Sequence, residues 1–321
     1  MRRKSPFGLV VVVVVLSWIA GAAALAGCGP SANDLNISNV DTHAFQVSLS
    51  LDQNSAARMV RGAITAIDAD RNAVKLSADE IRIFESSDRK KWHEVQFTVQ
   101  RRGEALLPLS AAICMDESGS MSGQPAQDAR QAVMAFFDYL QQGDRLAIVK
   151  FGQDVKVVQG FTDDRAALQD AVNTDLGWTE FLTAAWDAAY EGVKLAAPED
   201  APKAVLLTSD GEDDASHEIT ASKLIKAAVD AGVAIFTLGM SDDENSDGMK
   251  YLFKISSETG GLFYYFQDTS QMESVYDAIA QAFNQALVAT WTSTYSSGAV
   301  YVKVEVQTAS DKASTISAYH F

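Results

Sequence analysis

Cysteine and histidine are scarce in this chain. Its 321 residues include two cysteines, Cys28 and Cys114, and four histidines that lie far apart in the sequence. Scattered histidines provide neither the clustered ligands of a zinc site nor the triad of a hydrolase. Two cysteines are too few for a fold that several disulfides hold together. Cys114 lies in the apolar run 109–115, so we expect it to be a buried core thiol.

Basic side chains are also few. The chain has 26 Lys and Arg against 42 Asp and Glu, a formal net charge of −16. Nucleic-acid binding depends on neutralising phosphates with basic side chains, so this balance argues against a nucleic-acid partner. It argues equally against adsorption to anionic lipid, whereas an acidic surface is soluble and attracts divalent cations. Hydrophobic residues make up 47% of the chain, which is enough to bury a core.

One long apolar run stands at the N-terminus. Residues 2–4 are basic, and residues 7–24 are apolar apart from one serine. A basic segment, an apolar run and small residues in this order are the layout of an export signal. An uncleaved membrane anchor is the alternative, because roughly 20 apolar residues span a bilayer.

Residues 25–28, Leu-Ala-Gly-Cys, resemble the lipobox of bacterial lipoproteins. The resemblance implies removal of a signal peptide 1–27 and lipidation of Cys28, which leaves no partner for an intrachain disulfide. Gly29, rather than Asp, implies passage to the outer membrane in a Gram-negative cell. Removal of residues 1–27 changes the formal charge from −16 to −19, because three basic and no acidic residues are lost. We therefore expect an exported protein, lipid-anchored to the bacterial cell envelope.

Hydrophobic periodicity divides the rest of the chain. Residues 28–39 are expected to be a tether. Apolar and polar residues alternate at many places over 40–108, which predicts the short strands of a small all-β sandwich. The tail 290–321 alternates again from Val300 to Val306, and we expect its strands to join the sandwich. The region between them would then be an insertion.

The region 109–289 combines buried strands with helices. Apolar strands are predicted at 109–115, 145–151, 155–161, 203–209, 233–240 and 261–266. Helices are predicted at 125–142, 165–174, 184–196, 216–231, 247–258 and 270–289. This alternation predicts an α/β fold class: a doubly wound, mostly parallel sheet with helices on both faces.

Oxygen-bearing side chains follow two of these strands. Asp116, Ser118 and Ser120 come after the first, Asp210 comes after the strand at 203–209, and Thr183 begins a helix between them. Ligands of doubly wound sheets bind at the carboxyl ends of strands. Two carboxylates and three hydroxyls form an all-oxygen set that suits Mg²⁺, with Mn²⁺ or Ca²⁺ as alternatives, better than Zn²⁺. Such an ion keeps a coordination position open for a carboxylate from another molecule.

The Asp-x-Ser-x-Ser motif after an apolar strand resembles the metal-ion-dependent adhesion site of von Willebrand factor type A domains. The resemblance covers about residues 109–288 and extends to four further segments: 143–151, 161–168, 203–214 and 259–265. It implies that Asp116, Ser118 and Ser120 are the metal ligands of the first loop and that Asp210 is the later carboxylate. It also implies a protein partner that offers an Asp or Glu carboxylate to the metal.

The threonine position departs from the family pattern. The family often has Gly-Gly-Thr before a helix that begins x-x-Tyr-Asp-Ala. Here Thr183 precedes Ala-Ala-Trp-Asp-Ala, but Phe181 and Leu182 stand in place of the glycines and could narrow access to the metal. Thr179 is the alternative ligand. Three aromatic residues near the site are expected in the core, with a place on the ligand surface as the alternative: Trp178, Phe181 and Trp186.

The sequence therefore predicts a metal-dependent binding protein and not an enzyme. A phosphatase of the haloacid dehalogenase type is one alternative, but it needs a second Asp where Ser118 stands. No Gly-x-Ser-x-Gly elbow of an acyl-transfer enzyme is present. A scaffold whose metal serves only folding is the other alternative. The acidic segments 68–72 and 243–248 match calcium loops weakly. The first is predicted to be a hairpin turn and the second a solvated loop before a helix.

Overall fold

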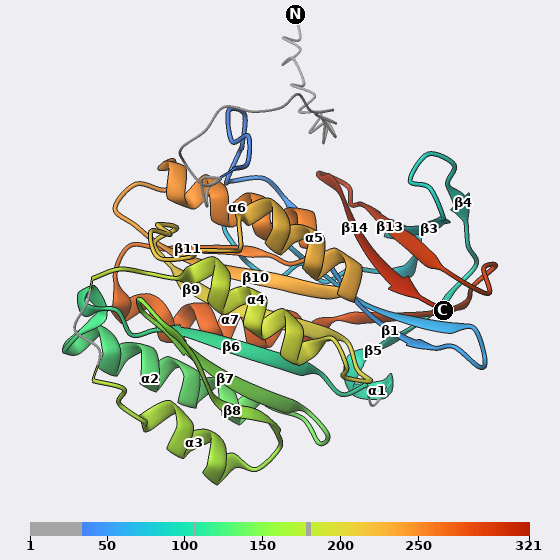
Figure 1. The fold of residues 1–321 in the computed structure, drawn as a ribbon. Helices are drawn as coiled ribbons and strands as arrows, with labels where there is room; N and C mark the ends of the chain where they lie inside the picture. The colour runs from blue at the N-terminus through green and yellow to red at the C-terminus, as the bar shows by residue number, and fades with distance from the viewer. Residues whose placement is uncertain (1–33, 106, 178–180) are drawn as a thin grey trace, which may run out of the picture.

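The structure is a computed structural model that describes residues 34–105, 107–177 and 181–321. Figure 1 shows an α/β body with antiparallel strands gathered at one end. The expected signal peptide and Cys28 lie outside the described residues. None of the described helices is long and apolar enough to cross a membrane.

A six-stranded sheet forms the centre of the α/β body, in the order β11-β10-β9-β6-β7-β8. All neighbours are parallel except β7 and β8, which pair antiparallel. Every residue of β6 is buried, which explains why its sequence does not alternate. The strands are β6 (Ser110–Asp116), β7 (Arg145–Phe151), β8 (Val155–Thr162), β9 (Lys203–Ser209), β10 (Val233–Met240) and β11 (Phe263–Phe266).

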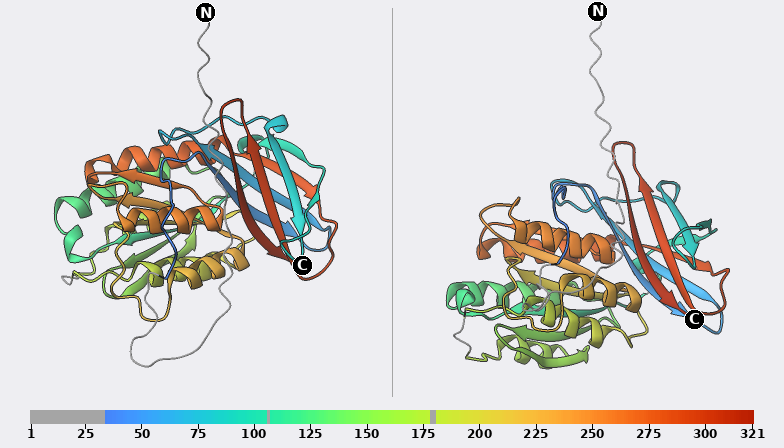
Figure 2. Two further views of the ribbon diagram at one scale, coloured as in Figure 1. Left: turned by 90° about the horizontal axis from the view of Figure 1, so that it is seen from above. Right: turned by 45° about the horizontal axis from the view of Figure 1, so that its top comes forward.

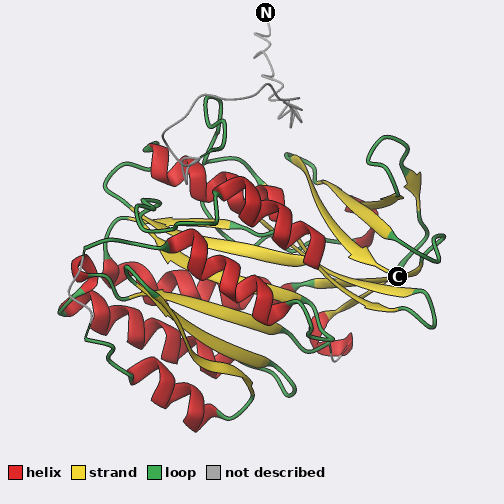
Figure 3. Cartoon of the chain, viewed as in Figure 1, coloured by secondary structure: helices red, strands yellow, loops and turns green. Residues whose placement is uncertain are grey.

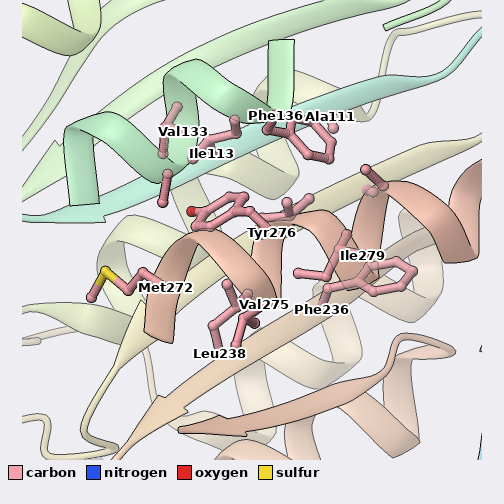
Figure 4. Close-up of a cluster of buried hydrophobic side chains, with 14 of the residues drawn as sticks. Ala111, Ile113, Val133, Phe136, Phe236, Leu238, Met272, Val275, Tyr276 and Ile279 are labelled. Atoms are coloured by element: carbon pink, nitrogen blue, oxygen red, sulfur yellow. The ribbon is translucent and has the colours of Figure 1, made fainter. Parts of the chain in front are cut away.

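Helices cover both faces of this sheet (Figures 1 and 3). One face carries α4 (Ala185–Ala196), α5 (Ala221–Ala231) and α6 (Asp247–Thr259). The other carries α2 (Gln124–Phe136), α3 (Arg165–Asn173) and α7 (Met272–Gln285). Figure 4 shows Tyr276 of α7 packed beside Phe136 of α2, with ring centroids 5.9 Å apart. The α/β fold class expected from the sequence is confirmed.

Three helix boundaries differ from the sequence expectation. The helix expected at 216–231 begins at Ala221, because Ser216 donates its hydroxyl to Asp213 and Thr220 caps the helix instead. The helix expected at 270–289 ends at Gln285, and β12 (Leu287–Thr292) follows at once. The helix expected at 125–142 ends at Phe136 and continues as a 3-10 turn. The short turns and helix that complete the fold are η1 (Ala78–Glu80), α1 (Arg102–Ala105), η2 (Gly119–Met121), η3 (Phe137–Tyr139) and η4 (Thr269–Gln271).

The strands at both ends of the chain form two four-stranded antiparallel sheets (Figure 2). The first has the order β1 (Gln46–Asn54), β2 (Met59–Ile67), β12 and β5 (Thr98–Arg101). The second has the order β14 (Lys312–His320), β13 (Ala299–Gln307), β3 (Ile81–Ser86) and β4 (His93–Glu94). C-terminal strands thus pair with N-terminal strands in both sheets. The alternating valines of β13 are fully buried in the core between the sheets.

A buried carboxylate links these two sheets. Glu85 of β3 has no exposed surface and accepts hydrogen bonds from groups on both sheets and on the loop after β12. Trp291 of β12 donates its indole N–H to Oε1 at 2.7 Å. Ser293 donates to Oε2 at 3.1 Å, and the hydroxyl of Tyr319 of β14 donates to Oε1. Burial is the main cause that raises the pKa of Tyr319, so this phenol remains a donor at neutral pH.

The antiparallel sheets contact the amino ends of the central strands. Leu49 of β1 donates its backbone N–H to the carbonyl of Gly260, just before β11. The side-chain amide of Gln46 accepts from the N–H of Phe263 at 2.8 Å and donates to its carbonyl, so it satisfies part of the exposed edge of β11. These contacts lie at the amino ends of the central strands. The carboxyl ends of β6 and β9 therefore point away from the sandwich that the two antiparallel sheets form (Figure 1).

Substitution of Glu85 by Gln should destabilise the protein by about 2–3 kcal/mol, because an amide N–H₂ would then face hydroxyl and N–H donors in a buried site. Chemical denaturation, followed by near-UV circular dichroism, measures the change. Glu94→Gln on the neighbouring strand is the matched control, since that carboxylate is exposed and pairs with Arg82 at the surface. Equal stabilities of the two variants would contradict the role assigned to Glu85.

Candidate metal centre

The carboxyl ends of β6 and β9 bring two aspartates to one edge of the sheet. The strands are parallel neighbours, with Cys114 opposite Leu207. Asp116 is the last residue of β6, and Asp210 directly follows β9. Both residues line a cavity of about 10 Å³ together with Ser120, which is room for one water-sized particle. Three of the residues that the sequence selected therefore border a common space.

The loop after β6 is held by its own polar side chains. Asp116 accepts a hydrogen bond from the backbone N–H of Ser118 at 2.8 Å, which turns the chain immediately after the strand. The hydroxyl oxygens of Ser118 and Ser120 lie 3.0 Å apart, so both hydroxyls face the same side of the loop. Ser118 is buried and Ser120 is exposed. This turn places hydroxyl oxygens next to the Asp116 carboxylate.

Thr183 is fixed by its backbone to the loop that carries Asp210. Its N–H donates to a carboxylate oxygen of Asp214 at 2.7 Å, and its carbonyl accepts from the N–H groups of Asp214 and Ala215. Thr183 is buried but is not among the residues that line the cavity. The rival, Thr179, lies outside the described residues.

Acidic residues after Asp210 also determine where α4 begins. Asp213 accepts hydrogen bonds from the backbone N–H of Trp186 at 3.0 Å and from the hydroxyl of Ser216 at 2.7 Å. Burial raises the pKa of Asp213 to about 6. No role was assigned to Asp213 from the sequence, although its place in the acidic segment 212–214 could have indicated a role in hydrogen bonding to a helix start. The segment ties the start of α4, and with it Thr183, to the end of β9.

The cavity is an electrostatically unfavourable place for two carboxylates without a cation. The pKa of Asp116 is raised to about 6, mainly by burial and also by the nearby charge of Asp210, although hydrogen bonds from Ser118 act to lower it. Burial also raises the pKa of Asp210. A bound divalent cation would offset both effects. Among the described residues, no cluster of three or more His, Cys, Asp or Glu side chains exists that could hold a metal ion, so a site here must use hydroxyls beside its two aspartates.

A buried ion network lies beside the first loop, and sequence reasoning missed it. Lys150 of β7 is fully buried, and its ammonium group donates to Glu117 at 2.6 Å and to the carbonyls of Val172 and Thr174 at the end of α3. Arg130 of α2 donates to the same carboxylate oxygen of Glu117 at 3.2 Å. The network connects the Asp116 loop to two helices. A lysine within the apolar strand 145–151 was the signal for it.

The aromatic residues near the site differ in exposure. Trp186 is fully buried in the core, as expected. Phe181 is 74% exposed and Leu182 is 42% exposed, so the core position expected for Phe181 is wrong. The reason is that Phe181 and Leu182 stand just before the point at which the chain enters the core, since Thr183 and Ala184 are buried. Trp178 lies outside the described residues.

The two acidic segments with a weak match to calcium loops form turns. The Asp68 carboxylate accepts from the N–H groups of Asp70 and Asn72, both at 2.9 Å. The Asp243 carboxylate accepts from the N–H of Asn245 at 2.9 Å. These hydrogen bonds account for the pattern of acidic and amide residues in both segments.

Substitution of Lys150 by Met should destabilise the protein by about 3 kcal/mol, because it leaves the Glu117 carboxylate buried with only Arg130 as an ionic partner. Adding Glu117→Gln to Lys150→Met should recover part of that loss. Denaturant midpoints of the two single variants and the double variant give the coupling energy. Additive effects of the two substitutions would show that the pair does not act as a unit.

Two curated proteins match part of this chain in sequence. An uncharacterized protein of Synechocystis sp. is 29% identical over 167 residues, which are 51% of this chain and 39% of that protein. A UPF0353 protein of Nocardia farcinica is 25% identical over 222 residues, 58% of this chain and 65% of that protein. The chain thus spans less than two thirds of the length of these curated relatives.

Solved structures with a similar fold include a von Willebrand factor type A protein from Catenulispora acidiphila, with 13% identity and a TM-score of 0.47 over 88% of this chain and 75% of that one. Proximal thread matrix protein 1 from the mussel byssus, solved with zinc in its metal-ion-dependent adhesion site, has 14% identity and a TM-score of 0.47 over 54% and 47%. The von Willebrand factor type A domain family itself matches residues 112–278, which is half of the chain. The chain therefore belongs to the von Willebrand factor type A domain family.

Proposed function

We propose that this protein binds a protein partner through one divalent metal ion at the carboxyl edge of its central sheet. The ligands that this chain would supply are Asp116, Ser118, Ser120, Thr183 and Asp210. Mg²⁺ is the ion that such a set suits first, with Mn²⁺ and Ca²⁺ as alternatives. When bound, the metal supplies an electrophilic position for an Asp or Glu carboxylate of the partner.

The observation that carries this proposal is the shared cavity of Asp116, Ser120 and Asp210. Mg²⁺ usually takes only one or two carboxylates from a protein and completes its six oxygen ligands with neutral groups, water or another molecule. Two aspartates balance the charge of the ion, and hydroxyls add none. A carboxylate from outside is therefore attracted to the site, where a third carboxylate of this chain would repel it.

The surroundings of the site favour binding over catalysis. A phosphatase needs a second carboxylic acid two residues after the first Asp, and Ser118 stands there. Lys150, the buried lysine beside the site, gives its ammonium hydrogens to Glu117, Val172 and Thr174, so it is not available to neutralise a phosphate. A metal that serves only folding is the remaining alternative, and it predicts no dependence of partner binding on the metal.

The anchoring of the protein is part of the proposal. Lipidation of Cys28 would attach the mature chain to the bacterial cell envelope, on the outer membrane in a Gram-negative cell. Two or more acyl chains hold a protein stably at a bilayer, whereas one does so only marginally. Binding at the sheet edge would then link a second protein to the envelope.

Metal binding should weaken as the pH falls through about 6. Burial raises the pKa of the Asp116 carboxyl to about 6, so a proton competes with the metal below this pH, and affinity should fall roughly tenfold per pH unit. Isothermal titration with Mg²⁺ and Mn²⁺ between pH 8 and pH 5 measures this dependence. An affinity that is constant from pH 7 to pH 5 would show that Asp116 is not a ligand.

Removal of the metal should abolish capture of the partner. Crosslinking and affinity capture from the native envelope are compared in Mg²⁺ and in EDTA, for the wild type and for Asp116→Ala. Asp138→Asn is the matched control, because that carboxylate is exposed and lies in η3, after α2. If EDTA and Asp116→Ala leave capture unchanged, the adhesion mechanism is wrong. Steady turnover of a phosphate ester that is lost in Asp116→Asn would instead establish an enzyme.

A further inference from the structure

The segments next to the candidate ligands Thr183 and Asp210 differ in chemistry. Tyr139, Phe181 and Leu182 are the large hydrophobic residues that are exposed in the described part of the chain. Two of these three are consecutive and directly precede Thr183. The apolar side of the site is therefore the side from which α4 begins.

The apolar pair is attached to a fixed part of the backbone. Two hydrogen bonds join the chain right after it to other loops: the N–H of Thr183 to Asp214 at 2.7 Å, and the N–H of Ala184 to the carbonyl of Gly152 at 2.8 Å. The side chains of Phe181 and Leu182 nevertheless remain exposed. Because the backbone next to these side chains is already anchored, a partner that covers them orders little further backbone and pays little backbone entropy.

The opposite side of the site is acidic. The loop after β9 packs closely on the start of α6: a Cβ added to Gly211 would lie 2.3 Å from the carbonyl oxygen of Gly248. This close approach brings together exposed carboxylates from the ends of β9 and β10. They are Glu212, Asp242, Asp243 and Asp247, whereas Asp214 lies on the apolar side, where it accepts from Thr183. Lys250 of α6 offsets part of this charge through its ion pair with Asp247 at 3.4 Å.

We infer that the partner presents its carboxylate between an apolar side chain, which covers Phe181 and Leu182, and a basic side chain, which faces the acidic side. This inference rests on the proposed metal-dependent binding and specifies the partner that the site selects. Apolar contact supplies affinity, because water leaves the two hydrophobic side chains. Charge complementarity supplies orientation, because a partner docked the other way would place its basic group on the apolar pair.

A peptide library tests this inference. Random 12-mers displayed on phage are selected on the full chain in Mg²⁺ and in EDTA. The wild type should select, in Mg²⁺ only, peptides with an Asp or Glu that has an apolar residue on one side and Lys or Arg on the other. A selected peptide should bind Phe181→Ser/Leu182→Ser at least about tenfold more weakly, a loss of ~1.4 kcal/mol. That variant should still require Mg²⁺ and the acidic residue.

Matched variants separate the two sides of the site. Tyr139→Ser removes the third exposed hydrophobic residue and should leave peptide affinity unchanged. Glu212→Gln/Asp242→Asn should remove the preference for Lys or Arg and retain the apolar preference. Selection of acidic peptides without an apolar preference, or the same preference in Phe181→Ser/Leu182→Ser, overturns the inference while the proposed function stands. Absence of any Mg²⁺-dependent selection of acidic peptides overturns both.

Discussion

The parallel pairing of β6 with β9 is the constraint on which the candidate site depends. In a parallel pair both carboxyl ends point the same way, so the residues that end the two strands must meet at one edge. Asp116 and Asp210 are 94 positions apart in sequence and line one cavity because of this register. The complete burial of β6 in turn depends on helices on both faces of the sheet, which makes the edge a rigid place for polar side chains.

The sandwich of the two antiparallel sheets holds the α/β body at the opposite end, where the central strands begin. The α/β body leaves the sandwich after β5 and returns to it at β12, and these two strands are neighbours in one sheet. Arg102 donates its backbone N–H to the carbonyl of Ala286, and the side chain of Arg101 donates to the carbonyl of Gln285. Hydrogen bonds thus join the first and last segments of the α/β body at the end where its strands begin. At the carboxyl edge the proposed docking site lies beside β6 and β9, whereas the loop after β10 is held by ion pairs from Arg71 and His43 to Glu244.

Much of this architecture was predictable from local sequence patterns. The apolar strands at 203–209 and 233–240 have the same bounds in the sequence prediction and in the structure, because burial on both faces leaves an unbroken hydrophobic run. The start of β12 was not predictable in this way, because residues 287–289 continue the apolar pattern of α7 and become a strand only through pairing with β2 and β5.

The residues of the candidate site likewise divide into those that the sequence predicts and those that it does not. Motif residues such as Asp116 and Asp210 were predictable because the strand that precedes each one sets its position. The roles of Lys150 and Asp213 were not, because they depend on contacts between segments that only the fold brings together. The exposure of Phe181 was mispredicted for a related reason. An aromatic residue four positions before a core helix is expected in the core, and only the path of the chain places it at the surface.

The buried network around Glu117 would allow the proposed metal to stay electrophilic beside an acidic loop. Glu117 directly follows Asp116, and its charge also acts to raise the pKa of Asp116. A carboxylate at this position would add a third negative charge near the ion and weaken its attraction for an outside carboxylate. Lys150 and Arg130 both bind Glu117 and so balance its charge inside the protein. The two aspartates then remain the acidic residues that line the cavity, and in the proposed site this count of two would suit a divalent ion with a position open to a partner.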